Sequence, residues 1–234
     1  MIRALLLTLA LAAPAEARCR LALALGMDIS SSVNSWEYEL QLYGLAAAFR
    51  DEAVIEAILS VPGQHVLVLP YEWSGQMQQD AIGGWTRLSS AEEIAALADR
   101  LSAHTRRYQN FSTGIGTALE YAIRQFDRLP ERCDRHVIDL SGDGVDNDGR
   151  TAPELHPRLI AAGITVNALV IAGGDPDPVS YYADQVIVGP DAFHLIARNG
   201  FEDYPELIKG KLIRELNPPL LIGEAAEEEP APTR

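Results

Sequence analysis

Two carboxylates and three hydroxyls stand beside apolar runs of this sequence, where they could bind a hard cation together. They are Asp28, Ser30, Ser32, Thr113 and Asp143. A ligand set made only of oxygen atoms suits Mg²⁺ or Ca²⁺ rather than zinc or copper. These residues therefore predict a divalent-metal site, provided that the fold brings three separate loops together.

A predicted strand and a predicted helix position the first of these loops. Residues 21–27 read Leu-Ala-Leu-Ala-Leu-Gly-Met, which is typical of a buried strand, and this run breaks at Asp28 into three serines. A helix is expected over 36–50, because Asn34 and Glu37 have the spacing of a capping box. A strand, an acidic loop and a helix in this order place side chains at the carboxyl edge of a parallel sheet, where open α/β sheets bind ligands.

The other two loops have similar settings. Thr113 precedes Gly114-Ile115-Gly116 at the start of a helical pattern that ends near Arg128, and Asp143 directly follows a predicted strand at 136–140. In a doubly wound sheet, the first and fourth parallel strands are neighbours at the point where the strand order reverses. We therefore expect the three loops to converge there.

Strand and helix patterns alternate along the rest of the chain. Strands are expected at 65–69, 81–86 (a short edge strand), 164–171 and 192–197, and helices at 51–59, 90–103, 153–162, around 181 and at 204–216. This alternation predicts an α/β fold, with a doubly wound, mainly parallel sheet and helices on both faces.

The two ends of the chain differ from the middle in composition. Residues 1–17 have a basic start, a short apolar run of about ten residues and an Ala-x-Ala ending, which predict a secretory signal peptide rather than a membrane span. Residues 18–216 form the predicted domain. Residues 217–234 are rich in Glu, Ala and Pro, and we expect this tail to be disordered. The prediction is an exported protein, periplasmic or secreted.

Size and charge limit the function further. A chain of 234 residues with 47% hydrophobic content is long enough for one domain of good size. Its formal charge of −14 argues against nucleic acid or an anionic membrane surface as the partner.

The only two cysteines, Cys19 and Cys133, each precede a predicted strand. If the two strands are parallel neighbours, their starts lie side by side and the cysteines can form a disulfide. Export makes that bond possible, and two free thiols are the alternative. Closing a loop of this length would stabilise the fold by about 4 kcal/mol in the chain-entropy model.

Several other sites are excluded or weak. An EF-hand fails, because Gly144 would occupy the first ligand position and Leu155 the twelfth, so Asp146 and Asp148 are interpreted as turn residues. The Gly114-Ile115-Gly116 fragment lacks the strand that precedes a dinucleotide-binding motif. The sequence has no Gly-x-Ser-x-Gly motif of a serine hydrolase. The serines after Asp28 could also serve only as helix caps.

The order of the five oxygen-bearing residues resembles a known metal site. Asp-x-Ser-x-Ser, then a threonine before Gly-Ile-Gly, then an aspartate before a glycine are similar to the metal-ion-dependent adhesion site (MIDAS) of von Willebrand factor type A domains, over residues 19–216. Four further stretches resemble the secreted bacterial family called domain of unknown function 1194: Glu72-Trp73-Ser74-Gly75, Ser141-Gly142-Asp143-Gly144, Tyr181-Tyr182 and Gly189-Pro190-x-Ala192-Phe193. Gly142 departs from the threonine that most type A domains have before the last aspartate.

The resemblance implies a Rossmann-like type A fold with strand order 3-2-1-4-5-6 and one antiparallel edge strand. It implies a metal, Mg²⁺ with Ca²⁺ or Mn²⁺ as alternatives, whose open position is filled by a Glu or Asp carboxylate of a protein partner. The protein itself is expected to be a monomer. Three further residues are expected on the rim of the ligand site, with a core position as the alternative for the first: Trp73, Ser74 and Ser112.

The resulting hypothesis is an exported, non-enzymatic, metal-dependent protein-binding module. Two alternatives remain open. A metal-dependent hydrolase could use the same oxygen cluster to activate water, although the sequence offers no evident general base beside it. A metal-independent scaffold could instead bind its partner through its helices.

Overall fold

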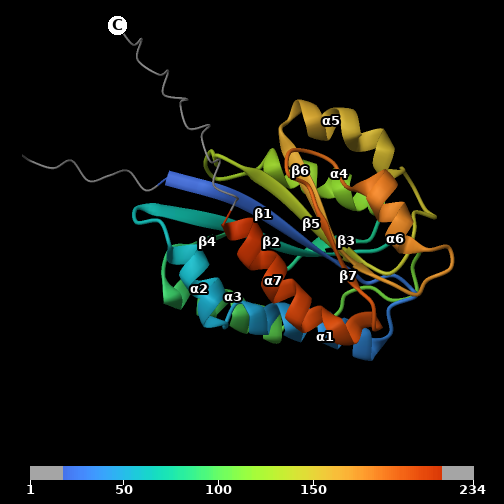
Figure 1. Cartoon of the computed structure of the whole chain (residues 1–234), viewed down its shortest axis with the longest axis horizontal. Coiled ribbons are helices and arrows are strands. Elements are labelled where there is room, and N and C mark those ends of the chain that lie inside the picture. The colour runs from blue at the N-terminus through green and yellow to red at the C-terminus, as the bar shows by residue number, and fades with distance from the viewer. Residues whose placement is uncertain (1–17, 218–234) are drawn as a thin grey trace, which may run out of the picture.

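Strand β1 (Arg18–Asp28) lies at the centre of a seven-stranded sheet in the computed structural model, which describes residues 18–217 (Figure 1). It pairs in parallel with β2 (Gln64–Trp73) on one side and with β5 (His136–Gly142) on the other. Strands β6 (Ile164–Ile171) and β7 (His194–Ala197) continue the parallel sheet beyond β5. The order β3-β2-β1-β5-β6-β7 confirms the predicted doubly wound sheet.

The antiparallel edge contains two short strands where the sequence predicts one. Strands β3 (Gln79–Ala81) and β4 (Thr86–Leu88) both pair with β2. Between them the chain turns at Gly83, whose φ of +85° is a conformation that favours glycine. The expected strand over 81–86 is therefore interrupted by this turn.

Helices cover both faces of the sheet (Figure 1). One face carries α1 (Ser35–Ala48), α2 (Glu52–Leu59), α3 (Ala91–Ser102) and α7 (Tyr204–Leu216). The other carries α4 (Ile115–Phe126), the short helix η1 (Ala152–Leu155) with α5 (His156–Ala161), and α6 (Pro178–Tyr181) with a π-helical turn, η2 (Tyr182–Val186). A last short turn, η3 (Gly200–Asp203), leads into α7.

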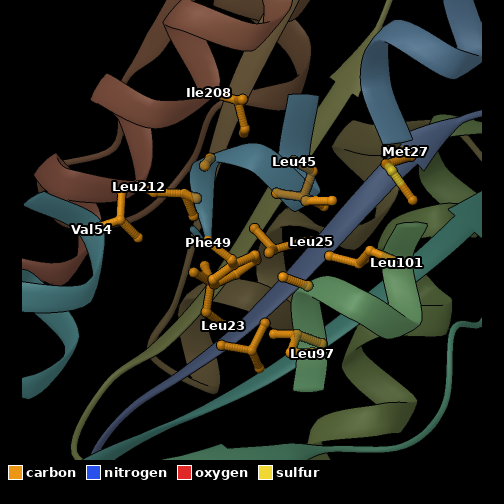
Figure 2. Packing of buried hydrophobic residues seen from close by; sticks show 14 of the residues in the cluster. Leu23, Leu25, Met27, Leu45, Phe49, Val54, Leu97, Leu101, Ile208 and Leu212 are labelled. Carbon is orange, nitrogen blue, oxygen red and sulfur yellow. The ribbon is translucent and has the colours of Figure 1, made fainter. Parts of the chain in front are cut away.

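Alternation along β1 separates the two halves of the core. Leu23, Leu25 and Met27 pack against α1, α3 and α7, as Figure 2 shows. The opposite face of β1 carries smaller residues, and a Cβ atom at Gly26 would lie 2.7 Å from the Tyr71 hydroxyl oxygen. The central strand thus presents large side chains to one helical layer and leaves space for a tyrosine of β2 in the other.

The predicted helices are close to those observed. The capping box of α1 is present, since the Asn34 side chain accepts hydrogen bonds from two backbone N–H groups and Glu37 accepts one from the Asn34 N–H at 2.8 Å. The expected helix at 153–162 is divided into η1 and α5. Pro157 lies at the start of α5 and has no N–H to continue the preceding turn.

A disulfide joins Cys19 to Cys133 with a Cα–Cα distance of 4.6 Å, as the sequence predicts. It lies at the amino-terminal end of β1, opposite the end that carries Asp28. Among residues 18–217, no helix is long and apolar enough to cross a membrane. The predicted signal peptide (1–17) and nearly all of the predicted tail (217–234) lie outside the described residues.

Candidate metal centre

The loop that follows β1 folds its side chains back toward the strand end. Asp28 is the last residue of β1, and its Oδ1 accepts a hydrogen bond from the Ser30 N–H at 2.7 Å. The Ser30 and Ser32 hydroxyls are 3.0 Å apart, and the Ser32 hydroxyl donates to Oδ1 of Asp143 at 2.6 Å. One continuous set of polar contacts therefore connects the end of β1 to the loop after β5.

Thr113 joins the same group from a third loop. Its N–H donates to the Asn147 side chain at 2.8 Å, and the Asn147 N–H donates to its carbonyl at 2.9 Å. A Cβ atom on Gly144 would lie 3.3 Å from the Thr113 hydroxyl oxygen, so this hydroxyl lies directly beside the residue that follows Asp143. The structure thus brings together all five residues that the sequence singles out.

Burial disfavours the ionised forms of the Asp28 and Asp143 carboxylates. Asp28 is fully buried, and this burial, with the nearby charge of Asp143, raises the pKa of Asp28 to about 7. Burial also raises the pKa of Asp143, against the hydrogen bond from Ser32, and the charge of Glu37 acts in the same direction as burial. A bound cation would relieve this repulsion, since it would favour the ionised form of both carboxylates.

A cavity of about 410 Å³ opens beside the cluster. Its lining includes Ser32, Thr113 and Asp143 on one side, the loop 172–176 on another, and Phe201. These three side chains present hydroxyl and carboxylate oxygens to one space that is large enough to admit the side chain of another molecule.

The donor set fits a divalent cation. One oxygen of the buried Asp28 carboxylate, Oδ2, has no hydrogen-bond partner in the described part of the chain. No group of three or more His, Cys, Asp or Glu residues able to hold a metal occurs within 18–217. The cluster has two carboxylates, so the hydroxyls would supply the remaining oxygen ligands of a hard cation bound there.

Two polar side chains that no local sequence pattern marks, the half-buried Arg106 and the buried Gln41, hold the loop after β1. The Arg106 guanidinium donates to the carbonyls of Ile29 at 2.7 Å, Ser30 at 3.0 Å and Val33 at 2.7 Å. The Gln41 side chain donates to the Asp28 carbonyl at 2.9 Å. These hydrogen bonds hold the backbone of the loop, so the Ser30 and Ser32 hydroxyls are free to face the cluster.

The loop after β5 is held by its own acidic residues. Asp146 accepts hydrogen bonds from the N–H groups of Ile115, Gly116 and Ala152, at the starts of α4 and η1. Asp148 accepts one from the Gln76 N–H at 2.9 Å. Asp146 and Asp148 thus connect neighbouring segments to this loop. This agrees with their interpretation as turn residues, and their contacts are not those of an EF-hand.

Two of the three residues expected on the rim are buried instead, and for Trp73 this is the core position given as its alternative. Trp73 and Ser74 are fully buried, so neither forms an exposed rim. The Ser74 hydroxyl donates to the carbonyl of Ser112 at 2.8 Å, and Ser112 itself is exposed. The expectation for Trp73 and Ser74 is therefore corrected: β2 continues to Trp73, and this residue packs in the core between the sheet and α4.

One family model and several solved structures match this chain. A family model described as "Protein of unknown function (DUF1194)" matches residues 18–220. A search of the curated proteins found no match.

Several solved structures have the same fold. Proximal thread matrix protein 1 from the mussel byssus, with a zinc-occupied MIDAS motif, is 15% identical with a TM-score of 0.58, covering 86% of this chain and 47% of that one. A von Willebrand factor type A protein from Catenulispora acidiphila is 18% identical with a TM-score of 0.55, covering 84% and 43%. The pilus adhesin SpaC from Lactobacillus rhamnosus GG is 15% identical with a TM-score of 0.58, covering 84% and 31%. This chain thus spans less than half the length of these proteins, and it has the von Willebrand factor type A fold.

Proposed function

The chain belongs to the DUF1194 family and has the von Willebrand factor type A fold, and from this premise we propose that it is a non-enzymatic protein-binding module. It would act after export, in the periplasm or outside the cell, as a monomer. Its partner would present a Glu or Asp carboxylate to a divalent metal held by Asp28, Ser30, Ser32, Thr113 and Asp143.

The observation that supports this proposal is the convergence of the five side chains beside an open cavity. The Ser30–Ser32–Asp143 contacts order the hydroxyls, and Asp28 keeps one carboxylate oxygen without a partner within 18–217. A metal bound there would supply an electrophilic centre, because three of its five protein ligands are neutral hydroxyls. A partner carboxylate can then satisfy the remaining charge of the cation.

The cavity lining is consistent with binding rather than hydrolysis. It contains no histidine among the described residues, and the carboxylate of Glu37 is engaged by the Asn34 N–H at the start of α1. The remaining carboxylate of the lining outside the cluster is Asp175, and no histidine accompanies it there. Turnover of phosphoesters by the purified protein would contradict this part of the proposal.

The oxygen ligands favour Mg²⁺, with Ca²⁺ and Mn²⁺ as alternatives. The byssus protein has a MIDAS motif occupied by zinc, so Zn²⁺ belongs in the same comparison. The four ions are distinguished by titrating each into chelator-treated protein and comparing their dissociation constants by calorimetry.

The first test is the loss of metal binding in an isosteric variant. Asp28→Asn keeps the shape of the side chain but removes its charge, so it is expected to weaken Mg²⁺ or Mn²⁺ binding by at least about 100-fold, more than 2.7 kcal/mol. Calorimetry and the metal-induced rise in melting temperature measure this. Asp134→Asn is the matched control, because Asp134 pairs with Arg18 at the opposite end of β1 and its loss should leave the affinity unchanged. Wild-type protein that binds none of the four ions would overturn the proposal.

A second measurement addresses the carboxylate. A partner captured from a periplasmic extract should be released by EDTA and also by millimolar acetyl-glutamate with the metal still present. Release by neither reagent would favour the metal-independent scaffold.

A further inference from the structure

Position 142 is a glycine because three side chains occupy the space around it. A Cβ atom on Gly142 would lie 2.5 Å from the hydroxyl oxygen of Tyr182, 2.9 Å from Oδ2 of Asp28 and 3.1 Å from Cζ2 of Trp73. The first two distances are shorter than real Cβ contacts, so a larger residue at this position would displace Tyr182 or Asp28. The departure from the threonine of most type A domains thus has a local cause.

Each of these three side chains ends in a buried polar atom. Tyr182, Trp73 and Asp28 have no exposed surface. The Tyr182 hydroxyl, the Trp73 Nε1 and the Asp28 Oδ2 have no hydrogen-bond partner in the part of the chain that the structure describes. Leaving one such atom unsatisfied costs about 1–3 kcal/mol, so two of them beside one point, the Tyr182 hydroxyl and Asp28 Oδ2, indicate that they act together.

The three atoms are chemically complementary. An ionised carboxylate oxygen only accepts hydrogen bonds, an indole N–H only donates, and a phenol hydroxyl can donate. Since the Tyr182 and Asp28 oxygens both lie so close to the Cβ point of Gly142, a small shift would join them directly, and a single water molecule would also connect them.

We propose that Tyr182 is a positioning residue of the metal site, whose O–H group holds the second carboxylate oxygen of Asp28. This inference rests on the proposed function, because it concerns the same metal. The Ser30 N–H already fixes Oδ1 at 2.7 Å, so one donor on Oδ2 holds the whole carboxylate in one orientation and leaves the other lone pair of Oδ2 for the metal. Removing a partner of this kind from a metal ligand typically costs 10–100-fold in affinity.

The local structure explains how Tyr182 reaches this position. Asp177 caps α6, and the chain then forms the π-helical turn η2, closed by the Ile187 N–H to the Tyr182 carbonyl at 3.0 Å. Across this junction, the hydroxyl of Tyr181 donates to Asp146 at 3.0 Å, while Tyr182 points to Gly142. Two consecutive tyrosines therefore contact different parts of the metal centre.

The test is Tyr182→Phe, which removes the hydroxyl and keeps the ring. We expect its Mg²⁺ and Mn²⁺ dissociation constants, measured by calorimetry, to rise about 10-fold or more, while its melting temperature without metal stays within a few degrees of wild type. Tyr71→Phe is the matched control, because Tyr71 is equally buried and its hydroxyl donates to the Ala118 carbonyl away from the cluster. This control should bind metal as wild type does.

A second readout separates positioning from a general structural role. Metal addition should change the near-ultraviolet tyrosine absorbance of wild type and of Tyr71→Phe but not of Tyr182→Phe. Wild-type metal affinity in Tyr182→Phe would overturn this inference and leave the proposed function standing. Failure of the wild-type protein to bind any of the ions would overturn both.

Discussion

Two buried aspartates have similar pKa values but different surroundings. Burial raises the pKa of Asp28 and of Asp139 to about 7 in both cases. Asp139 has an opposite charge beside it, because Lys211 Nζ lies 2.6 Å from its carboxylate and 2.7 Å from that of Glu215. The charge of Asp28 faces only another carboxylate among the described residues. Asp28 thus lacks, among the described residues, a positive charge of the kind that Lys211 provides beside Asp139.

Asp139 makes stability depend on pH. Its pKa is higher in the folded protein, through burial and Glu215, than the ordinary value of 3.8, so the folded state binds more protons than the unfolded state between these values. The contribution of Asp139 to the free energy of unfolding therefore falls as the pH rises from about 4 to about 7. The facing groups on the neighbouring elements are Lys211, Glu215 and Asn167, and the last donates to Glu215 at 2.7 Å. Urea denaturation in EDTA at pH 4–8 should show this slope in wild type.

The matched variants for this prediction are Asp139→Asn and Asp134→Asn. The first lacks the titrating group and should lose this part of the slope. The second removes an exposed carboxylate that pairs with Arg18, and should keep it. Parallel pH profiles for wild type and Asp139→Asn would contradict the assignment.

At the scale of elements, hydrogen bonds rather than apolar packing set the shape of the loops that carry the five clustered side chains. Arg106 connects the segment after α3 to three carbonyls of the loop after β1. Arg106→Met should therefore lower the free energy of unfolding by about 1–3 kcal/mol and weaken metal binding, because buried carbonyls lose their donors and the Ser30 and Ser32 hydroxyls lose their fixed position.

The neighbouring arginine provides the comparison. Arg107 is largely exposed and pairs with Asp80 at 2.9 Å, so Arg107→Met should change the stability by less than about 1 kcal/mol. Both variants are measured by chemical denaturation and by Mg²⁺ titration. An equal, small effect of the two substitutions would show that the guanidinium of Arg106 does not hold the loop.

Local sequence patterns predicted the strands and helices that carry the cluster. They did not predict the features that depend on contacts between residues far apart in the sequence. The apolar run of β1 and the capping box of α1 depend on near neighbours in sequence, so the position of Asp28 followed from them. Arg106 contacts residues more than seventy positions away, and no local spacing marks it.

The limits of β2 were underestimated for a related reason. The apolar run ends at Leu69, but pairing with β1 extends the strand through Pro70 to Trp73. The pairing turns Trp73 inward, where the indole lies against Gly142. Whether a strand-end aromatic is a rim or a core residue thus depended on register with another strand, which the sequence of β2 alone does not contain.

For the whole molecule, the disulfide and the candidate metal centre lie at opposite ends of β1. The Cys19–Cys133 bond closes a separation of 114 residues, so its reduction should lower the free energy of unfolding by about 4 kcal/mol in the chain-entropy model. Because the ligands lie at the other end, folded protein reduced with dithiothreitol should keep its Mg²⁺ affinity. Denaturation and calorimetry on the same sample measure both quantities. A parallel loss of stability and affinity would show that the two ends are coupled.

The central place of β1 also has a mechanical consequence. A pull delivered through a partner bound at Asp28 would enter the molecule at the carboxyl end of this strand. To slip, β1 would have to slide past β2 and β5 at once, since it is hydrogen-bonded to parallel neighbours on both sides. The hydrogen bonds on both sides of β1 would then share the load in shear instead of opening one after another. A partner bound at Asp28 would therefore pull on a strand that is held by two neighbours.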